Sequence, residues 1–155
     1  MALLRLSALA LAACGTASAA PVASGPSVPA GWAVLPEMAS EVSRAAGTAV
    51  DAVSAFGEPS LGCYAVWISM HGKAADAPAL ADALVASLAG VNVTDVVRPT
   101  TADGALSLSF THAPYTGRLR AHLGAGRVTA LACFANDRGP SACAAACTAL
   151  LGAVP

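Results

Sequence analysis

The feature that most constrains the fold is the C-terminal stretch 127–154, which carries three of the five cysteines. Residues 128–134 combine β-branched, aromatic and small side chains without Gly or Pro, and this pattern predicts a strand. The Gly-Pro punctuation of residues 136–140 predicts a loop. Residues 141–151 repeat their larger apolar side chains at a helical spacing, and Gly152 follows. We therefore expect a strand, a tight loop and a helix.

The N-terminal residues have the pattern of a secretion signal. Residues 1–13 carry one cation, Arg5, followed by a compact apolar stretch, as in the n-region and h-region of a signal peptide. Leu-Ala-Ala-Cys at residues 11–14 resembles a bacterial lipobox, which predicts a lipidated Cys14. Ala-Ser-Ala at residues 17–19 resembles an ordinary signal-peptidase site, which would make residues 1–19 the signal. Both patterns predict export to a bacterial periplasm or outer membrane, and we favour the lipid-anchored form.

Beyond this leader, the composition predicts a tether and one domain. Residues 14–30 are mainly small residues and proline without periodicity, as in a flexible tether. This leaves residues 31–155 for a single domain. The net charge of -1 lacks the basic excess of a nucleic-acid-binding protein. No apolar run of about 20 residues occurs outside the N-terminus, so the sequence predicts no membrane-spanning helix.

Cysteine parity predicts that the C-terminal helix is bonded to the rest of the domain. Apart from Cys14, four cysteines remain, and in an exported domain they most simply form two disulfides. Cys143 and Cys147 lie one helical turn apart and face the same way, so a bond between them would strain the helix. We expect one of them to reach Cys63 and the other Cys133, with the connectivity open. A metal site and a redox pair are the alternatives.

Apolar periodicity predicts the elements that precede the C-terminal unit. We expect helices at 36–46 and 76–89, where larger apolar residues recur at a helical spacing and a glycine follows. Strands are expected at 48–56, 63–70 and 91–98, although the first is ambiguous because alanine fits both structures. The strand 63–70 is apolar on both faces, which favours a central position in a covered sheet.

The alternation in residues 106–112 and 117–123 predicts a β-hairpin. Its apolar side chains share one face if Phe110 pairs with Leu119 and Leu108 with Ala121, which leaves residues 113–116 as the loop. The opposite face then carries only polar side chains: Ser107, Ser109, Thr111, Arg118, Arg120 and His122. Such polarity predicts a hairpin that faces solvent on one side or lies near a sheet edge.

The order of these elements, together with one short motif, resembles a known fold. After Pro-Ala-Gly-Trp at residues 29–32, we expect helix, hairpin, helix, strand, strand hairpin, strand and helix. This order is similar to the Mog1p/PsbP-like fold of exported bacterial lipoproteins and photosynthetic lumen proteins. The resemblance implies an α+β domain, an antiparallel sheet covered by helices in a three-layer α/β/α sandwich, here with a disulfide-stapled C-terminal helix. Members of the fold have diverse, largely non-catalytic roles, so no site residue is implied.

No motif in the sequence specifies a reaction. A nucleophile elbow, paired zinc knuckles, a phosphate loop and a dinucleotide fingerprint are all missing, so we expect no cofactor and no metal. His71, His112 and His122 are expected at strand ends or on the surface, the last two on opposite faces and toward opposite ends of the hairpin. The scattered carboxylates do not support a two-carboxylate hydrolase.

One surface has the composition of a binding site. Arg118, Arg120 and His122 form a strip that suits a carboxylate, a phosphate or a protein partner, because the donors of Arg match the oxygens of these anions. The simpler interpretation is a solvated strand face. Tyr115, in the expected loop, is either a contact residue or a cover for the core edge.

These observations favour a non-catalytic envelope domain that acts by protein or small-ligand binding. Its expected partners are the membrane, through a lipid on Cys14, and an envelope protein. Nucleic acid is not an expected partner, and the sequence predicts no oligomeric state. Two alternatives stay open: an enzyme whose site is assembled from distant residues, and a thiol or metal module on Cys143 and Cys147.

Overall fold

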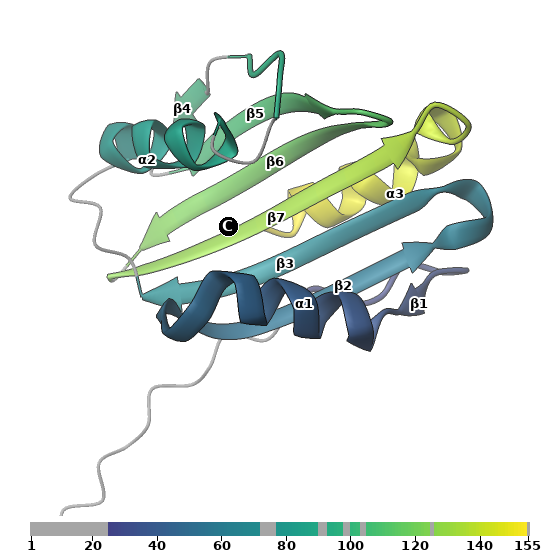
Figure 1. Cartoon of the computed structure of the whole chain (residues 1–155), viewed down its shortest axis with the longest axis horizontal. Coiled ribbons are helices and arrows are strands. Elements are labelled where there is room, and N and C mark those ends of the chain that lie inside the picture. The colour runs from purple at the N-terminus through teal and green to yellow at the C-terminus, as the bar shows by residue number, and fades with distance from the viewer. Residues whose placement is uncertain are drawn as a thin grey trace, which may run out of the picture.

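The computed structural model describes residues 25–71, 77–89, 93–97, 100–102, 105–124 and 126–154. These residues form an α+β fold with one antiparallel sheet in the order β1-β2-β3-β7-β6-β5-β4 (Figure 1). The strands are β1 Ala33–Val34, β2 Val50–Glu58, β3 Cys63–His71, β4 Thr100–Ala102, β5 Ala105–His112, β6 Tyr115–Gly124 and β7 Arg127–Asn136. The helices are α1 Pro36–Ala46, α2 Ala77–Ala89 and α3 Pro140–Gly152, with 3₁₀ turns at Gly47–Ala49 and Pro59–Leu61.

The C-terminal unit folds as predicted and covers the centre of the sheet. Disulfides join Cys143 of α3 to Cys63 of β3, and Cys147 to Cys133 of β7, with Cα–Cα distances of 5.7 and 5.6 Å. The expectation that each helix cysteine reaches a different strand is therefore confirmed. A Cβ at Gly139 would overlap the carbonyl oxygen of Leu61, so the loop before α3 requires glycine.

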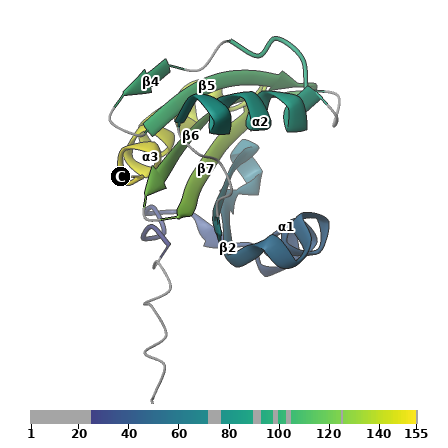
Figure 2. The same ribbon diagram turned by 90° about the vertical axis from the view of Figure 1, so that its left-hand side faces the viewer.

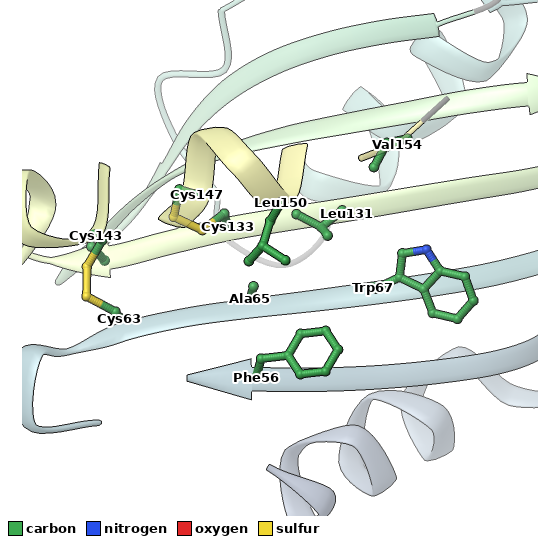
Figure 3. Packing of buried hydrophobic residues seen from close by; sticks show 11 residues of the cluster. Phe56, Cys63, Ala65, Trp67, Leu131, Cys133, Cys143, Cys147, Leu150 and Val154 are labelled. Carbon is green, nitrogen blue, oxygen red and sulfur yellow. A yellow bond between two sulfur atoms is a disulfide. The ribbon is translucent and has the colours of Figure 1, made fainter. Parts of the chain in front are cut away.

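The core beneath α3 is formed by β3 and β7, the two central strands (Figure 3). Alternate residues of β3 point toward α3, as the two-residue period of a strand requires. Ala65 and Trp67 of β3 and Leu131 of β7 are buried there in one cluster with Leu150. The alternation predicted for β3 and its central position are both confirmed.

The opposite face of the sheet is covered by the other helices, which lie on the far side from α3 (Figure 2). Leu80 and Ala81 of α2 pack with Leu106, Leu108 and Leu119 in a second buried cluster. By contrast, α1 packs along β2 and contributes no buried residue. It ends at Gly47, whose φ of 69° is a conformation that favours glycine.

The β5–β6 hairpin is correct in its faces but wrong in its predicted register. Leu108 pairs with Leu119, and Phe110 with Gly117, a shift of two residues from the expected pairing. Only Ala113 and Pro114 form the turn, so Tyr115 and Thr116 belong to β6 and not to the loop. A shift of two residues leaves every side chain on its original face. A Cβ at residue 117 would overlap the ring of Phe110, so glycine permits this pairing.

Two further expectations need correction near the outer edge of β5. Residues 91–98 were expected to form a strand, but the described part, 93–97, makes one isolated bridge, between Thr94 and Thr111. Residues 100–102, where the sequence predicted no strand, form the edge strand β4. Val or Thr favours a strand in each segment, so local propensity does not distinguish them, and pairing with β5 determines both outcomes. The ambiguous segment 48–56 is a strand, as favoured, and spans Val50–Glu58.

Candidate functional site

The polar strip predicted on β6 lies on the same sheet face as α3. Arg118 pairs with Cys133, and Arg120 with Leu131, both of which contribute to the core beneath that helix. In the other direction, Arg118 pairs with Ser109 and Arg120 with Ser107 of β5. Residues paired directly in adjacent strands share a face. The α3 face therefore changes from apolar at β7 to cationic at β6 and hydroxyl-bearing at β5.

Beside α3, this polar part of the face forms an open groove, which we call the α3 groove. It consists of two adjoining hollows of about 550 and 450 Å³, which share Val97, Ser109, Arg118 and Thr148. The first hollow reaches Thr116 and Pro140, and the second reaches Arg120 and Gly152. Strand β6 thus runs along the floor from residue 116 to residue 120, with α3 beside it.

The second wall of the α3 groove is the segment 94–97. It lies along β5, where Thr94 and Thr111 exchange backbone hydrogen bonds and the Val97 N–H donates to the Ser109 carbonyl at 3.1 Å. Asp95 and Val97 line the groove from this side, and the Val97 residue is 64% exposed. The groove therefore has a helix on one side and an irregular segment on the other. Sequence reasoning placed a strand at this wall and gave it no part in the site.

The two arginines of the α3 groove have incomplete hydrogen bonding within the described residues. Arg118 Nη2 donates to Thr148 Oγ1 at 3.1 Å. The Nε of Arg120 is buried without any hydrogen-bond acceptor. Among the described residues, neither guanidinium lies within ion-pair distance of a carboxylate. The two ion pairs found there both involve Asp51. The buried Nε is closed to solvent, so an incoming anion would meet these arginines through their other guanidinium donors.

The histidines do not line the α3 groove. His122 follows Arg120 on the same face of β6 and pairs with Thr129, but neither hollow reaches it. His112 pairs with Tyr115 beside the turn, so the two histidines lie on opposite faces and toward opposite ends of the hairpin, as predicted. The Tyr115 ring packs edge-to-face on Phe134 and on Tyr64, and it therefore covers the end of the sheet.

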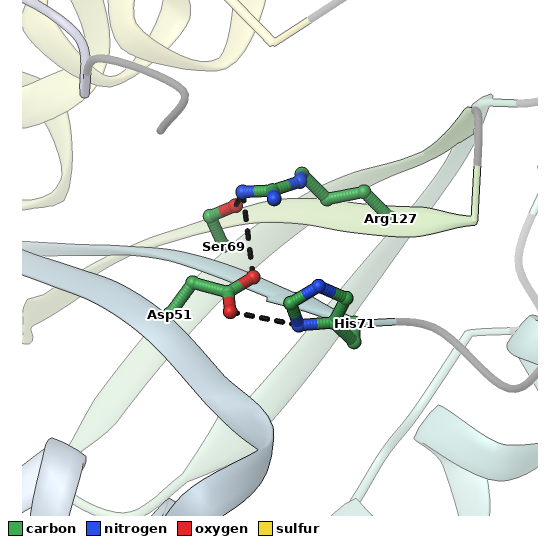
Figure 4. Close-up of polar contacts among 4 residues, drawn as sticks. All are labelled: Asp51, Ser69, His71 and Arg127. Atoms are coloured by element: carbon green, nitrogen blue, oxygen red, sulfur yellow. Dashed lines mark hydrogen bonds and ion pairs between the residues drawn. The ribbon is translucent and has the colours of Figure 1, made fainter. Parts of the chain in front are cut away.

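Sequence reasoning missed a polar cluster at the other end of the α3 face (Figure 4). His71 Nδ1 lies 2.8 Å from one oxygen of Asp51, and Arg127 Nη1 lies 3.3 Å from the other. The register of β2 shifts at Asp51, and such bulges redirect a side chain. Arg127 also donates to the Oγ of Ser69, at 3.3 Å. The available signal was the pairing of β3 with β7. It places His71, the last residue of β3, directly opposite Arg127, the first residue of β7.

This Asp51 cluster contains the residue types of a serine hydrolase but not the required arrangement. Catalysis needs a serine hydroxyl that contacts both the histidine and the substrate. Ser69 is fully buried, and its hydroxyl accepts a hydrogen bond from Arg127, not from His71. The His71 side chain is 73% exposed, and neither hollow of the α3 groove includes it. The geometry fits an ion-pair network that joins three strand ends.

The remaining candidate groups and the comparisons add no specific chemistry. Cys143 and Cys147 are both in disulfides, and the described residues contain no group of three potential metal ligands. Those disulfides indicate an oxidising compartment. Among the described helices, none has the length and apolarity needed to cross a membrane. Comparison with protein-family models, with curated proteins and with solved structures found no match.

Proposed function

We propose that the protein is an exported, non-catalytic binding domain that holds an anionic group of its ligand in the α3 groove. The observation that carries this proposal is the pair Arg118 and Arg120, which line the groove without a carboxylate partner among the described residues. Guanidinium groups bind carboxylates and phosphates through charge-assisted, often bidentate hydrogen bonds. The hydroxyls of Ser107, Ser109 and Thr148 line the same hollow and add neutral donors.

The chemistry of the lining favours binding over catalysis. General acid–base catalysis needs a group that can exchange a proton near neutral pH, whereas Arg stays protonated. The described lining of the two hollows contains no histidine and one carboxylate, Asp95. Among the described residues, Asp95 accepts a hydrogen bond from Thr94, which lines neither hollow, and no hydroxyl of the groove is bonded to a base that could activate it as a nucleophile.

The proposal is tested by titrating the protein with acetate while following the arginine Nε–H signals by NMR. A carboxylate in the groove should shift the Arg120 signal saturably, because Arg120 lines the second hollow and has no carboxylate partner among the described residues. Arg138, which is exposed and outside the groove, is the internal control. Equal, non-saturating shifts at Arg120 and Arg138 would contradict the proposal, because they would show only general ionic effects.

The membrane anchor and the layer architecture extend this proposal. A lipid on Cys14, after removal of residues 1–13, would hold the domain at a bacterial envelope membrane, where an envelope protein could reach the groove. The buried clusters on opposite sheet faces support the three-layer sandwich of a Mog1p/PsbP-like domain. Intact mass of the protein from its native envelope tests the anchor: a diacyl or triacyl adduct on Cys14 supports it, and an unmodified chain that starts at Ala20 opposes it.

A further inference from the structure

We propose that the ligand of the α3 groove is an extended acidic peptide segment whose acidic side chains occupy alternate positions. The inference rests on the proposed function, since it names the partner class for the same groove. Three properties of the groove support this ligand: its direction along β6, the spacing of its arginines, and the polarity of its two ends.

The α3 groove is elongated along β6. Its two hollows lie side by side, and together they follow the floor from Thr116 to Arg120. Four steps along a strand span about 13 Å at roughly 3.3 Å per residue. The α3 wall begins at Pro140 in one hollow and reaches Gly152 in the other. A groove of this length accommodates an extended chain better than a single small anion.

The spacing of the arginines matches the repeat of such a chain. Arg118 and Arg120 are two residues apart on one face of β6, so their Cα atoms are separated by about 6.6 Å. Side chains at alternate positions of an extended peptide repeat at the same distance and on the same side. Two alternate carboxylates can therefore face Arg118 and Arg120 together, whereas adjacent carboxylates point to opposite sides.

Each arginine has donors left for a carboxylate. Arg120 lines the groove without a carboxylate partner among the described residues, and its guanidinium has donors besides the buried Nε. The partner of Arg118 is the neutral hydroxyl of Thr148, and a charged acceptor makes a stronger hydrogen bond than a neutral one. Ser109 and Ser107 pair with these arginines across the strand, so each proposed carboxylate position has a guanidinium and a hydroxyl beside it.

The two ends of the groove differ in charge. Asp95 lines the hollow that reaches Thr116, and the hollow that contains Arg120 has no acidic lining residue among those described. Arg118 shares the first hollow with Asp95, so an acidic side chain toward Thr116 would be repelled more than one beside Arg120. Val97 and Leu151 line the Arg120 hollow and offer apolar surface between the charges.

Two peptide isomers with equal charge test the inference by calorimetry on the whole purified protein at low salt. One is acetyl-Gly-Glu-Gly-Glu-Gly-amide, with alternate acids, and the other is acetyl-Gly-Glu-Glu-Gly-Gly-amide, with adjacent acids. The alternating isomer should bind about tenfold more tightly, because it alone engages both arginines. Substituting Arg118→Gln or Arg120→Gln should remove this preference, whereas Arg138→Gln, outside the groove, should leave it intact.

The outcomes separate this inference from the proposed function. Equal affinity for the two isomers, or a preference that survives both groove substitutions, overturns the alternating-peptide inference. If neither peptide binds while acetate still shifts the Arg120 signal, the peptide inference fails and the anion-binding groove stands. If neither peptides nor acetate act at the groove, both proposals fail. A tenfold preference that depends on Arg118 and Arg120 supports both.

Discussion

One face of the sheet is closed over β3 and β7 and open over β5 and β6. Under α3 the strands contribute Ala65, Trp67 and Leu131, and two disulfides fix the helix in place. One strand further, the same face carries Arg118 and Arg120, and α3 borders the open surface without covering it. The two regions share a backbone geometry, so side-chain chemistry alone separates them.

The difference indicates a division of roles between stability and recognition. Burial of apolar side chains stabilises the closed region by about 25 cal/mol per Å² removed from water. The open region has an arginine Nε without an acceptor among the described residues, and such a group costs stability unless a ligand satisfies it. The following predictions test whether the closed region carries stability and the open region carries binding.

The largest expected effect is on the disulfides of the closed region. Replacing Cys63 and Cys143 by Ala opens a link with a sequence separation of 80, whereas Cys133 and Cys147 are separated by 14. The chain-entropy model gives losses of about 4.5 and about 3 kcal/mol respectively. Urea unfolding of the two double variants measures both. A larger loss for Cys133→Ala/Cys147→Ala would show that the Cys133–Cys147 disulfide stabilises the folded state in addition to restricting the unfolded chain.

A matched pair of truncations compares the two regions directly. Leu131→Ala removes a fully buried side chain beneath α3 and should cost about 2–5 kcal/mol, from lost burial and the cavity that remains. Ser109→Ala, on the open part of the face, should change the free energy of unfolding by less than about 0.5 kcal/mol. Urea unfolding provides the comparison, and equal losses would contradict the division of roles.

The Asp51 cluster is polar like the groove, but its members already satisfy one another. Asp51→Asn removes the charge that contacts His71 and Arg127 and should cost about 1 kcal/mol, because these partners are partly solvated. The loss should shrink as salt screens the interaction. Chemical unfolding at low and high salt measures it. A change in peptide affinity without a change in stability would instead place this cluster in the binding site.

The effect expected at Arg120 is small and has the opposite sign. Arg120→Met retains an unbranched stem and removes the unpaired Nε–H, so stability should stay unchanged or rise by up to about 1 kcal/mol. Arg118→Met loses the contact with Thr148 and serves as the matched comparison. Thermal unfolding of both variants measures the effect. Destabilisation by more than about 1 kcal/mol at Arg120 would assign this residue to the core and not to binding.

The sequence predicted the elements of the closed region well because each had a strong local signal. Helical spacing predicted α3, and the cysteines one turn apart predicted bonds to two strands. The faces of the hairpin followed from alternation, so the Arg118 and Arg120 strip was found. The register was missed because a shift of two residues preserves that alternation, and only the contact of Gly117 with Phe110 distinguishes the two pairings.

The walls of the groove and the Asp51 cluster could not be predicted from local patterns. Segment 94–97 is placed by its hydrogen bonds to β5, a contact that depends on tertiary structure. No local pattern distinguishes Thr148 from other polar residues of a helix. Its contact with Arg118 depends on the position of α3. Asp51 reaches His71 and Arg127 only because the β2 register shifts there. In each case, residues far apart in sequence create the site.

The most direct test of the central claim is an amide NMR map of the protein titrated with acetyl-Gly-Glu-Gly-Glu-Gly-amide. The account predicts saturable shifts confined to the floor and walls of the α3 groove, at residues 107–111, 116–120, 94–97 and 140–152. Amides of the Asp51 cluster and of α1 should stay unchanged. Shifts centred outside the groove, or none at saturating peptide, would contradict a binding site between α3 and the hairpin.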